Sequence, residues 1–206
     1  HNEFDRVVKV PPSVSLDDAV WGHLYTLSSL CYRKAFFQPG EFVAIVGLGL
    51  LGLGAVALGP LFGARVAAIG NSSIRLGMAE KMGAHATFLS DDPDLHSNLD
   101  DFTNGHGVDL VILTANPWPA YRTSCEIVRN GGRVSVVSLL GRGEEPLDFN
   151  PLYTGYFFNK GIHLIAVNGE AGYLYPGQIE SGKVGPVKQP WEEWCEHLLA
   201  LMSEGL

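Results

Sequence analysis

VAIVGLGLLG, at residues 43–52, is the part of this chain that says most about its fold. It joins a β-branched apolar run to the pattern G-x-G-x-x-G, and a second apolar run, RVAAIG, follows at residues 65–70 after a helix-length segment. A buried strand, a glycine turn, a helix and a second buried strand make one βαβ unit. A chain with 25 glycines can match the glycine pattern by chance, so the flanking strands give the motif its weight.

The glycines of this motif and the residues around them predict contact with a dinucleotide. Gly47 permits a tight turn, Gly49 lets the backbone approach a pyrophosphate, and Gly52 lets the helix pack closely on the sheet. The helix that begins near Leu50 and Leu51 offers unpaired amides and the positive end of its dipole to phosphate groups. We therefore expect these residues to bind the cofactor through their backbone.

A membrane span is the alternative for this region, because residues 42–64 form a run of 23 residues without a charge, which is long enough to cross a bilayer. Six glycines and Pro60 interrupt the run, and no basic cluster flanks it closely. The strand, turn and helix interpretation also explains where the glycines lie. We expect no membrane partner.

Composition predicts an ordinary globular protein. The chain has 206 residues, of which 46% are hydrophobic and 17% charged, enough for one domain or one domain with part of another. The net charge of −8 makes a nucleic-acid surface unexpected. Cys31, Cys125 and Cys195 form no C-x-x-C pair, which indicates reduced thiols in a cytoplasmic protein. The chain begins with His1, so we expect a processed or excised piece.

Short apolar runs alternate with helical segments along the chain. Strands are expected at residues 43–46, 65–70, 87–89, 108–113, 133–138 and 162–167, with a further short strand within residues 1–12. Helices are expected at residues 19–37, 50–63, 73–82, 121–128 and 191–203, a helix or loop at 91–102, a turn at Gly131-Gly132 and a loop at 168–189. The alternation predicts an α/β fold with a doubly wound, parallel, six-stranded sheet of the Rossmann type.

Five motifs in the expected order resemble the medium-chain dehydrogenase/reductase superfamily, which includes the zinc-type alcohol dehydrogenases. They are Pro39-Gly40-Glu41, the glycine motif at 47–52, the R-x-x-x-A-x-x-x-G-A pattern at 75–84, Gly107-Val108-Asp109-Leu110-Val111, and the stretch at 128–134 that contains Gly131-Gly132. The resemblance covers roughly residues 15–205. It implies that residues 21–206 are the dinucleotide-binding domain.

The same resemblance implies a second, catalytic lobe that this chain lacks. Residues 1–20 are expected to be its trailing edge or linker, and the segment that returns to the lobe is expected after Leu206. In the family that lobe carries most zinc ligands and the substrate pocket, so the small-molecule substrate is expected to bind through it.

No zinc is expected on this chain. In zinc-containing relatives one ligand lies about 25 residues before the first glycine of the turn, which corresponds here to Gly22, a residue without a donor atom. His23 would substitute only if the register slipped by one residue. No Ser-His-Asp or Cys-His grouping stands out either, so we expect no catalytic residue in this chain.

The end of the second strand predicts NADP rather than NAD. Dinucleotide folds that select NAD place an acid at this point to bind the ribose 2′-OH, whereas this chain has Gly70. Asn71 and Ser72 offer hydrogen bonds and Arg75 a positive charge to a 2′-phosphate. The alternative is that Ser72 or Ser73 caps the next helix and Arg75 is a solvated surface residue.

The resemblance implies further cofactor contacts. Thr26 corresponds to a family hydroxyl near the nicotinamide ribose. Val137-Ser138 and Val167 correspond to strand ends whose backbone meets the carboxamide, and Thr114 and Ala115 lie on the adenosine side. For each of these residues, packing in the core or in a turn is the alternative.

Taken with the motifs, the resemblance implies hydride transfer between NADP(H) and a small alcohol or carbonyl compound. A catalytically idle nucleotide-binding sensor or scaffold is the alternative, and a flavin or S-adenosylmethionine binder is a weaker third hypothesis. Ile162 to Val167 would be an apolar sheet edge if left bare, so we expect a homodimer that pairs through it.

Overall fold

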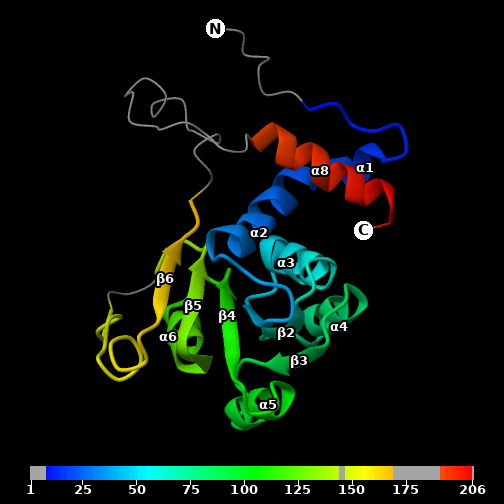
Figure 1. The fold of residues 1–206 in the computed structure, drawn as a ribbon. Helices are drawn as coiled ribbons and strands as arrows, with labels where there is room; N and C mark the ends of the chain where they lie inside the picture. Colours follow the sequence, from blue (N-terminus) through cyan, green and yellow to red (C-terminus); the bar gives the residue numbers. More distant parts are fainter. Residues whose placement is uncertain (1–7, 144–146, 169–190, 206) are drawn as a thin grey trace, which may run out of the picture.

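The computed structural model describes residues 8–143, 147–168 and 191–205 and contains a single parallel sheet (Figure 1). Its six strands lie in the order β3-β2-β1-β4-β5-β6. They are β1 (Phe42–Val46), β2 (Arg65–Gly70), β3 (Ala86–Leu89), β4 (Val108–Leu113), β5 (Val128–Val136) and β6 (His163–Ala166). The predicted α/β fold and all six of its strands are confirmed.

Helices cover both faces of this sheet. One face packs against α2 (Gly22–Lys34), α3 (Leu50–Leu61) and α4 (Ser73–Lys81), and the other against α5 (Leu95–Phe102) and α6 (Trp118–Ile127). Side chains alternate along β1, since Val43 and Ile45 join the first core while Ala44 and Val46 join the second. The central strand β1 is apolar throughout because both of its faces are buried.

Two further helices lie beside α2. The short α1 (Leu16–Ala19) precedes it, and α8 (Trp191–Ser203) packs against it (Figure 1). Gly22 makes this close approach feasible, because a Cβ on it would lie 3.2 Å from Leu199 Cδ2. The predicted helix at residues 191–203 is confirmed.

The uncharged run at residues 42–64 folds as β1, the glycine turn and α3. The helix contributes only 12 residues, and Pro60 lies in its last turn. The helix packs closely on β2: a Cβ on Gly59 would come within 2.4 Å of Val66 Cγ2, and the absence of a side chain at Gly59 permits this approach. Among the described helices, none is both long enough and apolar enough to cross a membrane.

The single helix expected at residues 19–37 is wrong, because the chain forms two. The Ser15 hydroxyl accepts from the Asp18 amide and caps α1, but the Trp21 amide bonds the Asp18 carbonyl at 3.0 Å and closes this short helix with a tight turn. At the other end, Phe36 has a left-handed backbone (φ +51°), and the Phe37 amide bonds the Tyr32 carbonyl at 3.1 Å. That arrangement ends α2 at Lys34 rather than Phe37.

The turn expected at Gly131-Gly132 is also wrong, because these residues lie inside β5. The pairing of β4 with β5 runs from Val108 opposite Val128 to Leu110 opposite Arg133, so β5 carries extra residues in a bulge. Gly131 supplies a positive φ of +69° there. The helix α6 therefore ends at Ile127 and the strand begins at once.

The short strand expected within residues 1–12 lies mostly outside the described residues. The described part, residues 8–12, forms no strand, and Pro11 begins a turn that the Val14 amide closes by bonding the Pro11 carbonyl at 3.0 Å. The loop expected at 168–189 lies outside the described residues apart from Asn168.

Candidate functional site

The carboxyl ends of β1 and β4 form the point at which the strand order reverses. From β1 the chain moves outward through β2 and β3, then crosses back to β4 on the other side of β1. Helices leave the two strands toward opposite faces at such a point, so a crevice opens between them. The glycine turn that follows β1 lies at this crevice.

Three glycines give this turn its shape. Gly47 has a left-handed backbone (φ +98°), and a Cβ on it would lie 2.7 Å from the Ala115 amide nitrogen. A Cβ on Gly52 would lie 1.9 Å from the Gly47 carbonyl oxygen, so only glycine allows α3 to begin so close to the turn. Gly49 differs from both, because nothing in the described chain lies within 4 Å of its Cβ position. The surface above Gly49 is therefore open to a ligand.

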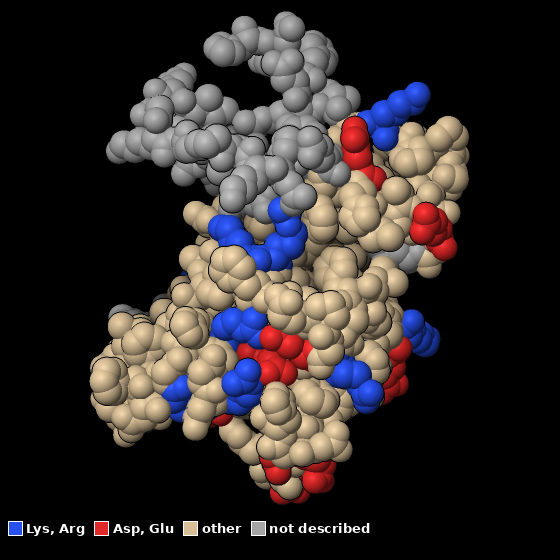
Figure 2. All heavy atoms as spheres, viewed as in Figure 1, with Lys and Arg blue, Asp and Glu red and all other residues tan. Residues whose placement is uncertain are grey.

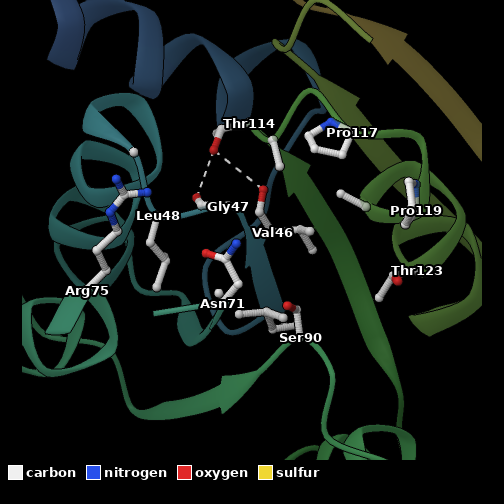
Figure 3. Close-up of a pocket in the computed structure, with 15 residues that line it drawn as sticks. Val46, Gly47, Leu48, Asn71, Arg75, Ser90, Thr114, Pro117, Pro119 and Thr123 are labelled. Carbon is white, nitrogen blue, oxygen red and sulfur yellow. Dashed lines mark hydrogen bonds between the residues drawn. The ribbon is translucent and has the colours of Figure 1, made fainter. Parts of the chain in front are cut away.

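A cavity of about 410 Å³, which we call the switch-point cavity, lies beside this turn (Figure 3). Residues at or just after the ends of β1, β2, β3 and β4 and residues of α4 and α6 line it: Val46, Gly47, Leu48, Gly49, Ile69, Gly70, Asn71, Arg75, Ser90, Thr114, Ala115, Pro117, Pro119, Ala120 and Thr123. Among them, Arg75 alone carries a charge. A mostly apolar cavity with a few hydroxyls, an amide and one guanidinium is suited to bind a nucleotide.

Several of the predicted site residues meet in this cavity. They are Gly47, Gly49, Asn71, Arg75, Thr114 and Ala115. Asn71 and Arg75 stand on the side of α4, opposite the residues of α6 (Figure 3).

The other predicted site residues do not line it, namely Thr26, Leu50, Leu51, Gly52, Ser72, Val137, Ser138 and Val167. Leu50, Leu51 and Gly52 form the first turn of α3, where the amides rather than the side chains are available. Ser72 precedes α4, and its hydroxyl makes no capping bond to that helix. The capping role that was the alternative for Ser72 is therefore absent.

Three of these residues lie at the neighbouring strand ends. The Val137 amide bonds the Leu113 carbonyl at 3.1 Å, and the Val167 amide bonds the Val136 carbonyl at 2.8 Å. Both residues thus extend the carboxyl edge of the sheet beyond β5 and β6. The Ser138 hydroxyl beside them is buried, and it has no hydrogen-bond partner within the described residues.

Thr26 lies in the middle of α2 and is buried. Its hydroxyl donates to the Gly22 carbonyl at 2.7 Å, and its own carbonyl accepts from the Ser29 hydroxyl at 2.7 Å. Thr26 therefore has a local hydrogen-bonding role in the helix.

Sequence reasoning missed the wall of the cavity that α6 supplies. We expected that helix to begin at Tyr121, but it begins at Trp118, so Pro117 and Pro119 fall at its entrance. Proline at the first helical positions is a usual start signal and would have located this wall. Ser90 was also missed, although it directly follows β3 at the same edge of the sheet.

The described residues hold no cluster of three or more His, Cys, Asp or Glu side chains that could ligate a metal. The position expected for a zinc ligand is Gly22, which packs against α8. On the face shown in Figure 2, acidic side chains lie next to several of the basic ones, so that face carries no continuous basic tract.

Comparison with known proteins gave consistent matches. The family model described as zinc-binding dehydrogenase matches residues 51–173. Sorbitol dehydrogenase of Bacillus subtilis is 32% identical over 145 residues, which are 70% of this chain and 41% of that protein. The NADP-dependent isopropanol dehydrogenase of Thermoanaerobacter brockii is 34% identical over 146 residues, 69% of this chain and 42% of that protein. The chain thus spans less than half the length of these two relatives.

Among solved structures, the alcohol dehydrogenase TADH of Thermus sp. ATN1 superposes with a TM-score of 0.72. That match has 23% sequence identity and covers 96% of this chain and 51% of the other. It confirms the fold.

Proposed function

Because the chain belongs to the zinc-binding dehydrogenase family, within the medium-chain dehydrogenase/reductase superfamily, we propose that it binds the nicotinamide dinucleotide of an oxidoreductase. The proposed reaction transfers hydride between NADP(H) and a small alcohol or carbonyl substrate. The observation that carries this proposal is the glycine turn at the switch point, with an open surface above Gly49 and a nucleotide-sized cavity beside it.

The pyrophosphate is proposed to lie over Gly49 and the first turn of α3. The amides of Leu50 and Leu51 begin that helix and have no partner within it, because the first amides of an α-helix lack acceptors. Such amides, with the positive end of the helix dipole, attract anions. Gly49 and Leu50 are both exposed, so the start of this helix can be reached from outside.

The 2′-phosphate of NADP is proposed to bind at the end of β2. Gly70 presents no carboxylate to repel it, while Asn71 and Arg75 line the cavity and the Ser72 hydroxyl is not engaged in capping α4. A guanidinium binds phosphate through charge-assisted hydrogen bonds. A relative whose name specifies NADP, the isopropanol dehydrogenase, agrees with this choice.

The nicotinamide end is proposed to lie over the ends of β5 and β6. The backbone of Val137 and Val167 would meet the carboxamide, and Thr26 would lie near the nicotinamide ribose. The buried Ser138 hydroxyl lacks a partner in the described chain, and a polar cofactor group would supply one. When bound, the cofactor gives or accepts the hydride, while these residues hold and orient it.

The remainder of the enzyme is proposed to lie in a second lobe. Residues 1–20 would be its trailing edge or linker, and residues 21–206 the dinucleotide-binding domain. The substrate, and zinc if the enzyme uses it, would bind in that lobe, which agrees with the share of the relatives that this chain spans.

We further propose a cytoplasmic homodimer. Residues 162–167 contain β6, which is the outermost strand of the sheet and carries apolar side chains at Leu164 and Ile165. Pairing with a second copy would cover that edge. All three cysteines lie in the described part of the chain, and none forms a disulfide, as expected of a reducing compartment. A monomeric mass by light scattering at micromolar concentration would count against the dimer.

Turnover by the complete gene product tests the catalytic proposal. We expect NADP-dependent oxidation of some members of a panel of small alcohols, or reduction of the matching ketones, followed by NADPH absorbance. Tight cofactor binding without turnover of any panel member would instead favour an idle sensor or scaffold. A yellow purified protein would indicate a flavin.

A further inference from the structure

The hydroxyl of Thr114 joins the end of β4 to the glycine turn. Its Oγ1 donates to the Gly47 carbonyl oxygen at 2.8 Å and lies 3.4 Å from the Val46 carbonyl oxygen (Figure 3). These residues are separated by more than sixty positions in the sequence, but they are neighbours where β1 and β4 pair. The contact therefore crosses the switch point itself.

With this hydrogen bond, both the amide and the carbonyl group of Gly47 are held in place. Its amide donates to the Ile69 carbonyl on β2 at 3.0 Å, and its carbonyl accepts from Thr114 on β4. Gly52 packs against the same carbonyl oxygen from the side of α3. The glycine has no side chain and the freest backbone of any residue, so these neighbours determine its orientation.

Fixing the Gly47 carbonyl also fixes the amide that follows it. The two groups share one planar trans peptide and point in opposite directions. Thr114 therefore directs the Leu48 amide away from β4 and sets the path of the chain into Gly49. An amide network that is ordered before the ligand arrives binds an anion at a lower entropic cost.

The hydroxyl has a single proton, which it gives to the turn. Phosphate oxygens accept hydrogen bonds and donate none, so Thr114 has no proton left to offer them. A direct contact with the pyrophosphate would require the hydroxyl to release Gly47.

We propose that Thr114 is a positioning residue that orders the glycine turn for the pyrophosphate. This role differs from the direct adenosine contact that the sequence resemblance implies, and it rests on the proposed function. Loss of the hydroxyl would disorder the turn and weaken pyrophosphate-containing ligands selectively.

The test compares Thr114→Val, which keeps the shape but removes the hydroxyl, with Thr114→Ser, which keeps the hydroxyl. Each variant and the wild type are titrated calorimetrically with NADPH, which contains a pyrophosphate, and with 2′-AMP, which does not. We expect Thr114→Val to lower the affinity for NADPH about three- to tenfold, which corresponds to the free energy of one hydrogen bond. Its affinity for 2′-AMP should be unchanged, and Thr114→Ser should resemble the wild type.

If Thr114→Val lost the same affinity for NADPH and for 2′-AMP, the proposal would be overturned in favour of a direct nucleoside contact. If it lost affinity for neither ligand, the proposal would also be overturned. Amide hydrogen exchange of residues 48–51 without ligand gives an independent readout. Faster exchange in Thr114→Val supports the proposal, and unchanged exchange contradicts it. If the wild type bound no nucleotide, the proposed function would fail, and the exchange result would still decide the role of Thr114.

Discussion

The two edges of the parallel sheet are built in opposite ways. At the amino edge, charged side chains close the structure: Asp109 is 4% exposed and accepts from Arg129 Nε at 2.7 Å and from the Phe42 amide at 2.9 Å. Nearby, Arg133 pairs with Glu41 at 2.6 Å. At the carboxyl edge, glycines and the Thr114 hydroxyl shape the turn beside an open cavity.

The difference shows how one sheet separates stability from binding. Ion pairs at the amino edge fill the space between strand ends and connect β1, β4 and β5. Charged side chains in the same arrangement at the carboxyl edge would occupy the place of the ligand. That edge is instead held by backbone groups, by the Thr114 hydroxyl and by close packing at Gly47 and Gly52. Substitutions at the two edges should therefore have separable effects.

The largest effect is expected at Gly52, where a substitution should affect both the stability of the fold and the binding of the cofactor. Gly52→Ala would place a methyl group 1.9 Å from the Gly47 oxygen, so the turn or α3 must move. We expect the free energy of unfolding to fall by about 3 kcal/mol. NADPH binding should be lost with it. Urea denaturation and calorimetry measure the two quantities.

Gly49→Ala is the matched control, because nothing in the described chain opposes its Cβ and its φ of −76° suits alanine. Its unfolding free energy should change by less than about 0.5 kcal/mol, while NADPH binding weakens because the methyl group occupies the approach of the pyrophosphate. If both alanine variants lowered the free energy of unfolding equally, Gly49 would be as necessary for packing as Gly52, which would contradict this interpretation.

The second effect belongs to the amino edge alone. Burial by itself would raise the pKa of Asp109, but the hydrogen bonds from Arg129 and Phe42 outweigh burial and hold this pKa below its ordinary value. We expect Asp109→Asn to lower the unfolding free energy by about 2 kcal/mol at pH 7, through lost charge-assisted hydrogen bonds. Affinity for NADPH should stay at the wild-type value.

The pH dependence of this effect has a definite sign. Since the carboxyl titrates lower in the folded state than in the unfolded one, its stabilisation is fully present above the ordinary pKa of about 4. It is lost as pH falls through the lower, folded-state pKa. The difference in the free energy of unfolding between wild type and Asp109→Asn should therefore become smaller below about pH 4. A difference that stayed constant down to pH 2 would contradict this interpretation.

The smallest effect concerns cofactor choice at the carboxyl edge. Arg75→Ala should weaken the binding of NADPH about tenfold and leave the affinity for NADH unchanged, because only NADPH carries the 2′-phosphate. Arg65→Ala is the control, since Arg65 is an exposed arginine at the start of β2 and lies outside the cavity. Equal losses for NADPH and NADH in Arg75→Ala would mean that Arg75 does not recognise the 2′-phosphate.

The fold could be predicted because its determinants are local. Apolar runs mark the strands, and the spacing of Gly47, Gly49 and Gly52 marks the turn. The bulge at Gly131-Gly132 could not, because it is a shift of register that arises only when β5 pairs with β4. The end of α2 was likewise missed, since Phe36 adopts a left-handed backbone that usually requires glycine.

The site was predictable only in part. Asn71 was predicted because it follows the end of β2, where dinucleotide folds contact the ribose, whereas Thr114 was predicted only from the resemblance to the family; both line the cavity. The wall from α6 depends on how that helix packs. The bond from Thr114 to Gly47 depends on two strands that pair although they are far apart in sequence. Neither contact leaves a periodic pattern in the sequence.

A parallel calorimetric titration of this chain with NADPH and NADH decides whether the switch-point cavity binds the cofactor. We expect saturable binding of both ligands, with NADPH the tighter because the end of β2 offers Arg75 and no carboxylate. Tighter binding of NADH would contradict the assignment of the 2′-phosphate. No binding of either nucleotide would contradict the claim that the switch-point cavity of this chain holds the cofactor.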